Sequence, residues 1–287
     1  MRQTLRSARF ERPLAVVLGT NEIASAVGVY LNRSGRAVLL SHDPLPPVMR
    51  RGMAFHDALF GDPALLEGIE AKRIDYVTEA FEVLAQRNRV AVTDFGLTDL
   101  LVLGKIDTIV DARMQKYNVT PDFRGLARIT IGLGPGFEVY RNCDVAVETH
   151  PASNGTVLRK GETAQPDNIP CALGDAGQER FIYSQAWGRW RTALEIGARV
   201  FKGVVVGHHG AIPVTAPIDG NLRGIVRDGT DVAAGVKLIE VDPRGRASQW
   251  TGLDERPRKI AEATMLAIRF CEAQRAFAHS VSSLLPN

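Results

Sequence analysis

Gly134 and Gly136 lie in the stretch Ile131-Gly-Leu-Gly-Pro-Gly-Phe137, which separates two β-rich runs of the chain. Glycine allows the backbone to turn sharply or to approach another group closely. Consecutive N–H groups in such a loop can form a concavity that binds an anion. The spacing fits a tight turn between strands equally well. The two glycines are therefore candidate anion-binding residues, with a simple turn as the alternative.

Arg50 and Arg51 form a second group that could bind an anion. They follow a predicted strand, and doubly wound sheets bind ligands at the carboxyl ends of their strands. Two guanidinium groups suit a phosphate, including the phosphate of a pterin-type cofactor. Asp111 ends another predicted strand, Arg113 follows it, and both could face the same crevice. The alternatives are a solvated arginine pair and a structural ion pair.

The elements that would position these residues begin with a strand–helix–strand pattern. Residues 14–18 and 37–40 have the composition of buried strands, and apolar residues between Ile23 and Leu31 recur at helical spacing. This pattern is the opening unit of a Rossmann-type sheet. Further strands are predicted at residues 90–93 and 108–111.

The turn after the first strand occupies the place of a dinucleotide fingerprint. The fingerprint needs glycine first for the turn, glycine second so that the pyrophosphate can approach, and a small residue third. Here these positions hold Gly19, Asn21 and Ala24. Because the second is not glycine, a nucleotide site and an inert scaffold both stay open. Gly19, Asn21, Glu22 and Ile23 are the candidate cofactor-binding residues of this turn.

Asp43 is the last candidate cofactor-binding residue of the first half. The residue that ends the second strand of such a sheet usually binds the ribose. His42 stands at this point, with Asp43 next to it. Asp43 could take the role after a small shift, and the alternative is a turn or helix cap.

Several of these stretches resemble one family. Residues 132–137 followed by Asp144-Val-Ala-Val-Glu-Thr149 resemble the central signature of the YqeB-type accessory proteins of selenium-dependent molybdenum hydroxylases. The resemblance extends from about Leu14 to Arg244. Its other matching segments are 46–55, 110–112, 216–220, 223–229 and 241–244. It implies a role in the maturation of a molybdenum hydroxylase. The family usually has Gly-Ala-Gly-Asp where this chain has Gly-Thr-Asn-Glu, and Glu where it has His42.

The expected fold class is α/β, with three parts. A Rossmann-like parallel sheet domain is expected over residues 1–125, where a nucleotide would bind. Short β runs punctuated by Gly, Pro and Asn follow from Ile129, and they predict a mostly β domain over residues 126–250. The resemblance implies that this domain is a biotin- or lipoyl-like barrel-sandwich. An amphipathic C-terminal helix is expected over residues 251–287, packed on a domain or on a second copy, so a homo-oligomer stays open.

The β domain contains an internal repeat. Gly197-Ala-Arg-Val-Phe-Lys-Gly203 and Gly229-Thr-Asp-Val-Ala-Ala-Gly235 each lead into a strand. A true carrier domain displays a lysine on the hairpin between its halves, but residues 204–220 contain none. We therefore expect no covalent biotin or lipoate.

Composition narrows the classes of function. The chain has 287 residues, 45% hydrophobic and 23% charged, with a net charge of +3, which does not by itself indicate nucleic acid. No apolar run approaches membrane-spanning length, and residues 14–18 are too few for a signal-peptide core, so we expect a cytoplasmic protein without a membrane partner. The three cysteines lack metal-type spacing, and no metal site is expected.

Three functional hypotheses follow. The first is an accessory protein that binds NAD(P), another nucleotide or a molybdopterin cofactor, with an apo molybdenum hydroxylase as its partner. The second is an NAD(P)-dependent oxidoreductase, and the third is a non-catalytic scaffold with a degenerate Rossmann fold. The sequence contains no nucleophile–base pair or acid–base pair with convincing spacing, so no catalytic residue is assigned.

Overall fold

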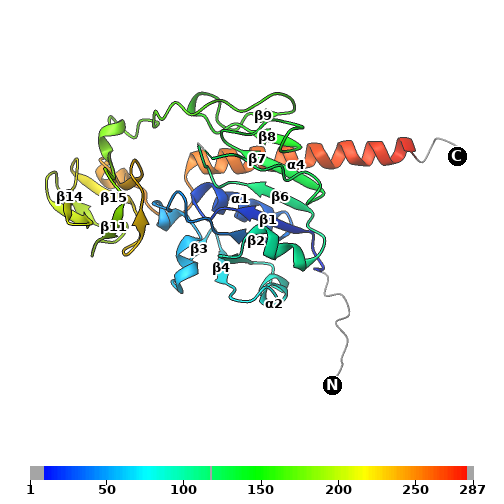
Figure 1. The fold of residues 1–287 in the computed structure, drawn as a ribbon, viewed down its shortest axis with the longest axis horizontal. Helices are drawn as coiled ribbons and strands as arrows, with labels where there is room; N and C mark the ends of the chain where they lie inside the picture. The colour runs from blue at the N-terminus through cyan, green and yellow to red at the C-terminus, as the bar shows by residue number, and fades with distance from the viewer. Residues whose placement is uncertain (1–9, 117, 283–287) are drawn as a thin grey trace, which may run out of the picture.

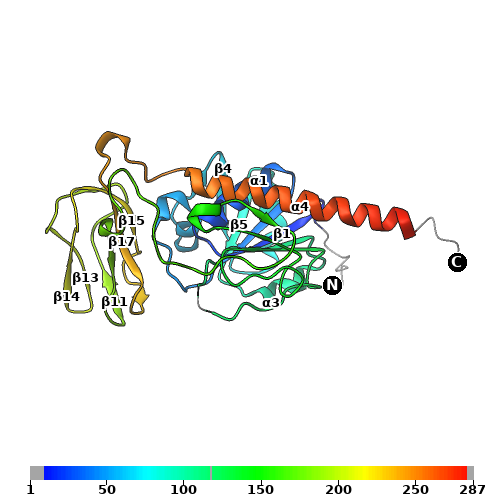
Figure 2. The same cartoon turned by 90° about the horizontal axis from the view of Figure 1, so that it is seen from above.

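The computed structural model describes residues 10–116 and 118–282. Figures 1 and 2 show a larger lobe of sheet and helices, a smaller β lobe at one end of it, and a long helix running along the larger lobe away from the smaller one. The protein is thus a mixed α/β structure, as the sequence predicts.

A nine-stranded sheet forms the larger lobe. Its strands, in spatial order, are β3 (Leu65–Leu66), β4 (Ile69–Arg73), β5 (Arg89–Thr93), β2 (Ala37–Ser41), β1 (Leu14–Leu18), β6 (Thr108–Asp111), β7 (Ile129–Leu133), β8 (Val145–Val147) and β9 (Val157–Leu158). The strands from β4 to β8 in this order run parallel, and β3 and β9 pair antiparallel at the two edges. Strand order reverses between β1 and β6, which creates a crevice at their carboxyl ends.

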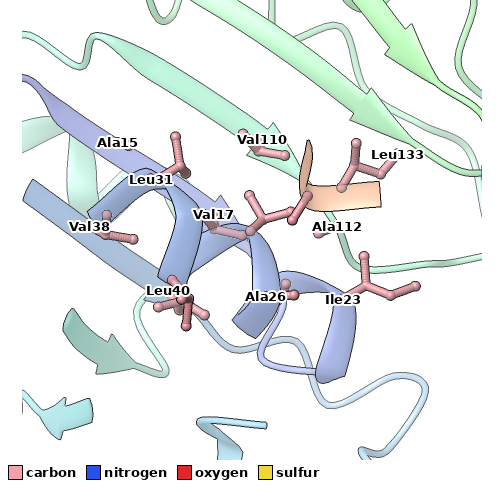
Figure 3. Close-up of a cluster of buried hydrophobic side chains, with 14 of the residues drawn as sticks. Ala15, Val17, Ile23, Ala26, Leu31, Val38, Leu40, Val110, Ala112 and Leu133 are labelled. Atoms are coloured by element: carbon pink, nitrogen blue, oxygen red, sulfur yellow. The ribbon is translucent and has the colours of Figure 1, made fainter. Parts of the chain in front are cut away.

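Helices cover both faces of this sheet. α1 (Glu22–Arg33) and α4 (Glu255–Ser282) lie on one face, and α2 (Glu79–Ala85) and α3 (Leu97–Leu100) lie on the other. Because side chains alternate along a strand, Ala15 and Val17 of β1 pack under α1, whereas Val16 packs on the opposite face. Figure 3 shows the hydrophobic core between α1 and the sheet, where α1 covers β1, β2 and β6. Strands buried on both faces explain the nearly continuous apolar runs.

α1 and α4 run in the same direction. Tyr30 of α1 donates a hydrogen bond to Glu262 of α4 (3.0 Å), and Arg36, just beyond α1, pairs with Glu272 (2.6 Å). α1 starts at the carboxyl end of β1, so the N-termini of both helices lie at the carboxyl edge of the sheet.

The smaller lobe consists of two antiparallel four-stranded sheets. One contains β10 (Phe181–Tyr183), β17 (Lys237–Asp242), β15 (Gly220–Ile225) and β12 (Arg199–Val200), and the other contains β14 (Ile212–Thr215), β13 (Val205–His209), β11 (Gly188–Arg191) and β16 (Asp231–Val232). Their inner faces enclose Trp190, Leu222 and Ile225. The Trp190 indole N–H donates to the carbonyl of Val226 (2.9 Å), so its polar atom is satisfied inside this core.

The internal repeat corresponds to a repeated crossing between the two small sheets. The first copy forms β12 and then β13, and the second forms β16 and then β17. In each copy the chain leaves one sheet and enters the other. Short 3₁₀ helices complete the fold: η1 (Arg51–Met53), η2 (His56–Phe60), η3 (Leu101–Leu103), η4 (Pro151–Ser153), η5 (Gln178–Arg180) and η6 (Gly245–Ala247).

The predicted domain boundary near residue 126 differs from the arrangement of the strands. β7, β8 and β9 belong to the nine-stranded sheet, and the chain enters the small lobe only with β10. Short apolar runs bounded by glycine read alike whether they add to a parallel sheet or start a β domain, because periodicity does not separate these cases. The C-terminal helix packs against α1 and β7 to β9 of the larger lobe. Within the described residues, none of the helices has both the length and the apolar character that crossing a bilayer requires.

Candidate functional site

Gly19 follows β1, at the carboxyl edge where strand order reverses between β1 and β6. Its φ is +110°, and a Cβ atom there would lie 3.0 Å from the Ala112 carbonyl oxygen. Its N–H donates to the Ser41 carbonyl (2.7 Å). A side chain at this position would therefore be strained and crowded, so packing between strand ends is sufficient to explain the glycine.

Several donors of the neighbouring turn are already used. The Asn21 side chain caps α1, where its Oδ1 accepts from the N–H groups of Ile23 and Ala24 (both 3.0 Å). Its Nδ2 donates to the Ala112 carbonyl (2.8 Å). The Ile23 side chain is buried in the core, and the Glu22 carboxylate adds a negative charge at the helix N-terminus. A pyrophosphate would have to displace the cap and face this carboxylate.

Asp43, Asp111 and Arg113 do lie together at the carboxyl edge. The Arg113 guanidinium donates to both oxygens of Asp111 (3.0 and 2.6 Å) and lies 3.5 Å from Asp43. Asp43 also accepts from the N–H of Leu45 (3.0 Å) and from Gln115 (2.9 Å). These contacts tie the loop after β2 to the loop after β6, which matches the structural ion pair and turn cap weighed from the sequence.

Arg50 joins the two lobes. Its guanidinium donates to both oxygens of Glu240 on β17 (2.7 and 3.1 Å) and to Glu22 at the start of α1 (3.2 Å). Burial by itself would lower the pKa of Arg50, but Glu240 and Glu22 raise it above its ordinary value. Its donors are therefore directed at protein carboxylates, and it is not a solvated arginine.

Glu240 is the centre of a buried ionic network. Its side chain is 0% exposed, and besides Arg50 it contacts Arg180 (3.1 Å) and Arg223 (3.7 Å). Burial would raise the pKa of Glu240, whereas Arg50, Arg223 and Arg180 together lower it. Arg223 is the least compensated member, because burial lowers its pKa and its Nε has no hydrogen-bond partner within the described residues.

Arg51 is 6% exposed and has a separate set of partners. Its Nε donates to the Ile225 carbonyl (3.0 Å), and its terminal nitrogens contact Asp57 (2.7 Å) and Glu195 (3.3 Å). Arg50 and Arg51 are thus both built into the junction between the lobes. Nothing in their contacts leaves two parallel guanidinium groups facing the crevice.

Gly134 and Gly136 both have positive φ, +89° and +87°. The N–H of Gly134 donates to the Val147 carbonyl (3.2 Å), which extends the pairing of β7 with β8. A Cβ atom at Gly134 would lie 3.0 Å from the Thr149 hydroxyl, and one at Gly136 would lie 2.9 Å from the Thr120 hydroxyl. The loop therefore packs on residues that follow β8 and β6, not on Arg50 and Arg51.

A cavity of about 360 Å³ opens beside Gly136. Its lining includes the carboxylates of Asp122, Glu138 and Glu162, and one arginine, Arg141, which pairs with Glu138 (2.9 Å). Asp122 pairs with Arg124 (2.8 Å), and Glu162 has no ion pair within the described residues, so the lining offers no surplus of positive charge for an anionic cofactor.

Arg256, which the sequence did not single out, lies at the carboxyl edge near the Gly134 loop. Its Nη2 donates to the carbonyl of Thr149 (2.9 Å), the residue whose hydroxyl lies next to Gly134. Its Nε is buried without a hydrogen-bond partner, and no ion pair involves it within the described residues. Burial lowers its pKa, and the charge of Glu22 opposes this shift. Arg256 lies in the first turn of α4, and the amphipathic pattern of this long helix does not indicate that it has unpaired donors.

Lys237 on β17 is a second cation without a carboxylate partner. Its ammonium lies 3.7 Å from the ring centroid of Phe181, and no hydrogen bond or ion pair to it is present within the described residues. Burial lowers its pKa to about 8, and the charge of Arg50 adds to the effect. Neither Lys237 nor Arg256 forms an ion pair within the described residues, although the charges of Glu240 and Glu22 act on them from farther away.

A relative of known sequence matches most of the chain. The protein is 30% identical over 256 residues to an uncharacterized protein, YqeB, of Escherichia coli strain K12. The chain is similar to YqeB. The match covers 89% of this chain and 47% of YqeB, so the chain spans about half the length of this relative. It supports the resemblance to a YqeB-type family. No protein-family model matches the chain.

Solved structures overlap with the chain only weakly. The product-bound ectoine utilization protein EutE (DoeB) of Ruegeria pomeroyi is 13% identical, with 80% of this chain and 85% of that chain covered and a TM-score of 0.24. An aspartoacylase family protein of Mesorhizobium loti is 12% identical, with 82% and 86% covered and a TM-score of 0.25. TM-scores this low do not establish a common fold.

The structure also brings together two histidines near the turn after β1 that the sequence does not identify as a pair. The Thr20 hydroxyl lies 3.0 Å from the Nδ1 atoms of both His42 and His56, and the two ring centroids are 5.0 Å apart. They are 14 residues apart in the sequence, in a region with no periodic signal.

No group of three or more His, Cys, Asp or Glu side chains suited to a metal occurs in residues 10–116 and 118–282.

His56 predicts a pH effect on stability. Burial lowers its pKa from 6.5 to about 3, and His42 and Arg51 add to the shift. Above pH 6.5 both the folded and unfolded states are neutral at this residue. Between pH 6.5 and 3 only the unfolded state is protonated, so the free energy of unfolding should fall by up to about 1.4 kcal/mol per pH unit.

The measurement is urea unfolding of wild type and His56→Gln at about pH 7.5 and about pH 5. The loss of stability on acidification should be smaller in the variant, while His208→Gln, at an exposed position, should behave as wild type. An equal loss in wild type and His56→Gln would show that His56 does not titrate in this way.

Proposed function

We propose that this protein is an accessory protein that binds a phosphate-bearing cofactor, either a nucleotide or molybdopterin, at the carboxyl edge of the nine-stranded sheet. Its partner in this proposal is an apo molybdenum hydroxylase. The similarity to YqeB supports the family context, although the chain spans about half of that relative. The proposal for the site rests on the geometry of Arg256.

The proposal depends on Arg256 because its guanidinium has donors without a hydrogen-bond partner within the described residues. Its Nε is buried without a partner within the described residues, and its one hydrogen bond is to a backbone carbonyl. A largely buried charge that no carboxylate contacts directly is costly, so such a group favours a bound anion. A phosphate would supply both the charge and the acceptors.

The surroundings of Arg256 favour the same ligand. The N-termini of α1 and α4 meet at this edge, and helix N-termini attract negative charge. Glu22 opposes this, but its carboxylate already pairs with Arg50 (3.2 Å). Lys237, which lies within electrostatic range of Arg50, adds a further cation at the junction.

The oxidoreductase hypothesis gains no support from the turn after β1. A nicotinamide dinucleotide needs free backbone donors at the start of α1. The Asn21 side chain occupies two of them (both 3.0 Å). Any phosphate is therefore better placed toward α4 than over the fingerprint.

We propose further that the larger lobe is an extended Rossmann-like domain and that the smaller lobe is a barrel-sandwich. The reversal of strand order between β1 and β6 supports the first assignment, although β5 rather than β4 lies next to β2. The repeated crossing between the two small sheets supports the second.

Calorimetric titration of the purified protein with NAD, NADP, ATP and molybdopterin tests the proposal. We expect at least one to bind, and Arg256→Gln to weaken it about ten- to hundredfold, since a hydrogen bond to a charged group contributes about 1.5–3 kcal/mol. Arg269→Gln removes the same charge from the exposed side of α4 and should bind as wild type. If none of the four binds at millimolar concentration, the scaffold hypothesis replaces this one.

Delivery to a partner needs a second experiment. Co-expression of a molybdenum hydroxylase with wild type or Arg256→Gln, followed by assay of its activity and cofactor content, tests the maturation role. Equal maturation by a stable Arg256→Gln variant would separate cofactor binding at this edge from any effect on the hydroxylase.

A further inference from the structure

A pocket of about 450 Å³ lies at the amino edge of the nine-stranded sheet, opposite the edge that holds Arg256. Arg12 and Gly35 precede β1 and β2, Ile69 begins β4, and Asn88 precedes β5, so the pocket is built where these strands start. Its described lining residues are Arg12, Asn32, Arg33, Gly35, Ile69, Arg87 and Asn88. Three are arginines, two are amides and none is a carboxylate.

The guanidinium of Arg12 is held in place at this pocket by hydrogen bonds to backbone carbonyls. Its terminal nitrogens donate to the carbonyls of Arg36 (3.2 Å), Gln86 (3.1 Å) and Leu84. These bonds satisfy the carbonyls at the end of α2 and hold the guanidinium in place. They do not neutralise its charge, because carbonyls are not ionised. A positioned, half-buried cation thus forms one wall of the pocket.

Arg87 is the unused member. It makes no hydrogen bond or ion pair to any residue that the structure describes. Burial of Arg12 lowers the pKa of Arg12, the charge of Arg87 adds to this shift, and the charge of Glu11 opposes it. Arg33 is different, because it pairs with Glu67 (3.3 Å) at the rim. Arg12 and Arg87 thus line one pocket as like charges, with no carboxylate among the described lining residues, and a bound anion would favour this arrangement.

We propose that this pocket binds the phosphate group of a small molecule. A phosphate placed between Arg12 and Arg87 would relieve their repulsion and accept from both guanidinium groups. The Asn88 side chain, which has no hydrogen bond to the described residues, would supply a further donor at the pocket wall. The volume lies in the range of small-molecule sites, and Ile69 provides an apolar surface for the body of a phosphate ester.

This site is independent of the one proposed for the cofactor, since the two lie at opposite edges of the sheet. Its test is calorimetric titration with inorganic phosphate, pyrophosphate and ATP at low ionic strength, in wild type and in an Arg256→Gln background. Binding should persist in that background. Arg87→Ala should weaken it at least tenfold, and Asn88→Ala should weaken it less.

Controls keep the result specific. Arg246→Ala is the control for Arg87→Ala. Both variants remove an exposed arginine, but Arg246 lies far from the pocket in the other lobe, so Arg246→Ala should bind as wild type. Binding of ATP more tightly than pyrophosphate would assign a phosphate ester, and equal binding of all three would assign a simple oxyanion. Absence of binding at millimolar concentration, or binding that survives in Arg87→Ala and is lost in Arg256→Gln, would overturn the proposal.

Discussion

Glu240→Gln is expected to destabilise the protein by about 3–5 kcal/mol, because removing one partner of a buried ionic network leaves uncompensated charges behind. The Glu240 side chain is 0% exposed and is the shared partner of Arg50, Arg180 and Arg223. Glutamine keeps the shape but not the charge. Three guanidinium groups at the junction between the lobes would then lose their common counter-ion.

Urea unfolding of wild type and variant at neutral pH measures the effect. Glu138→Gln is the matched control, since Glu138 pairs with Arg141 at an exposed position (2.9 Å) and should cost less than about 1 kcal/mol. Should Glu240→Gln cost no more than this control, the network would not be a determinant of stability. Separate transitions for the two lobes in the variant would indicate that the network holds them together.

The first βαβ unit could be predicted from the sequence. Residues 14–18 form β1 as predicted, residues 37–40 lie within β2, and the helical period between Ile23 and Leu31 corresponds to α1. These elements are buried on defined faces, and burial is what apolar patterning records. The later strands are short, and the sheet that each one joins is set by contacts distant in sequence.

The candidate site was predicted less well for the same reason. Gly19 and the pair Asp111 and Arg113 do lie at the carboxyl edge of the sheet. The use of Arg50 could not be foreseen, because its partner Glu240 is 190 residues away in the sequence. Two adjacent arginines after a strand look the same whether they face a ligand or a carboxylate on another lobe. Arg256 was missed because a helix stripe does not reveal which of its cations lacks a partner.

The glycine-rich stretch that resembles the family signature acts through packing. Gly132 lies in β7, and a Cβ atom there would fall 2.1 Å from the ring of Phe137, which is 4% exposed. The ring therefore rests directly on the strand backbone, and the turn through Gly134 and Gly136 brings it back over β7. This geometry requires glycine at position 132 whether or not an anion binds nearby.

Gly132→Ala is accordingly expected to cost about 1–3 kcal/mol, since the added methyl group must displace the ring. Phe137→Ala should cost about 3–5 kcal/mol through loss of buried surface. The double variant should be more stable than the sum of these two losses implies, because alanine at position 132 meets no ring once Phe137 is gone. Gly28→Ala is the control, as its Cβ atom would meet Leu40 at an ordinary 3.4 Å. Strictly additive losses in urea unfolding would mean that the two residues act separately and that the ring of Phe137 does not require glycine at position 132.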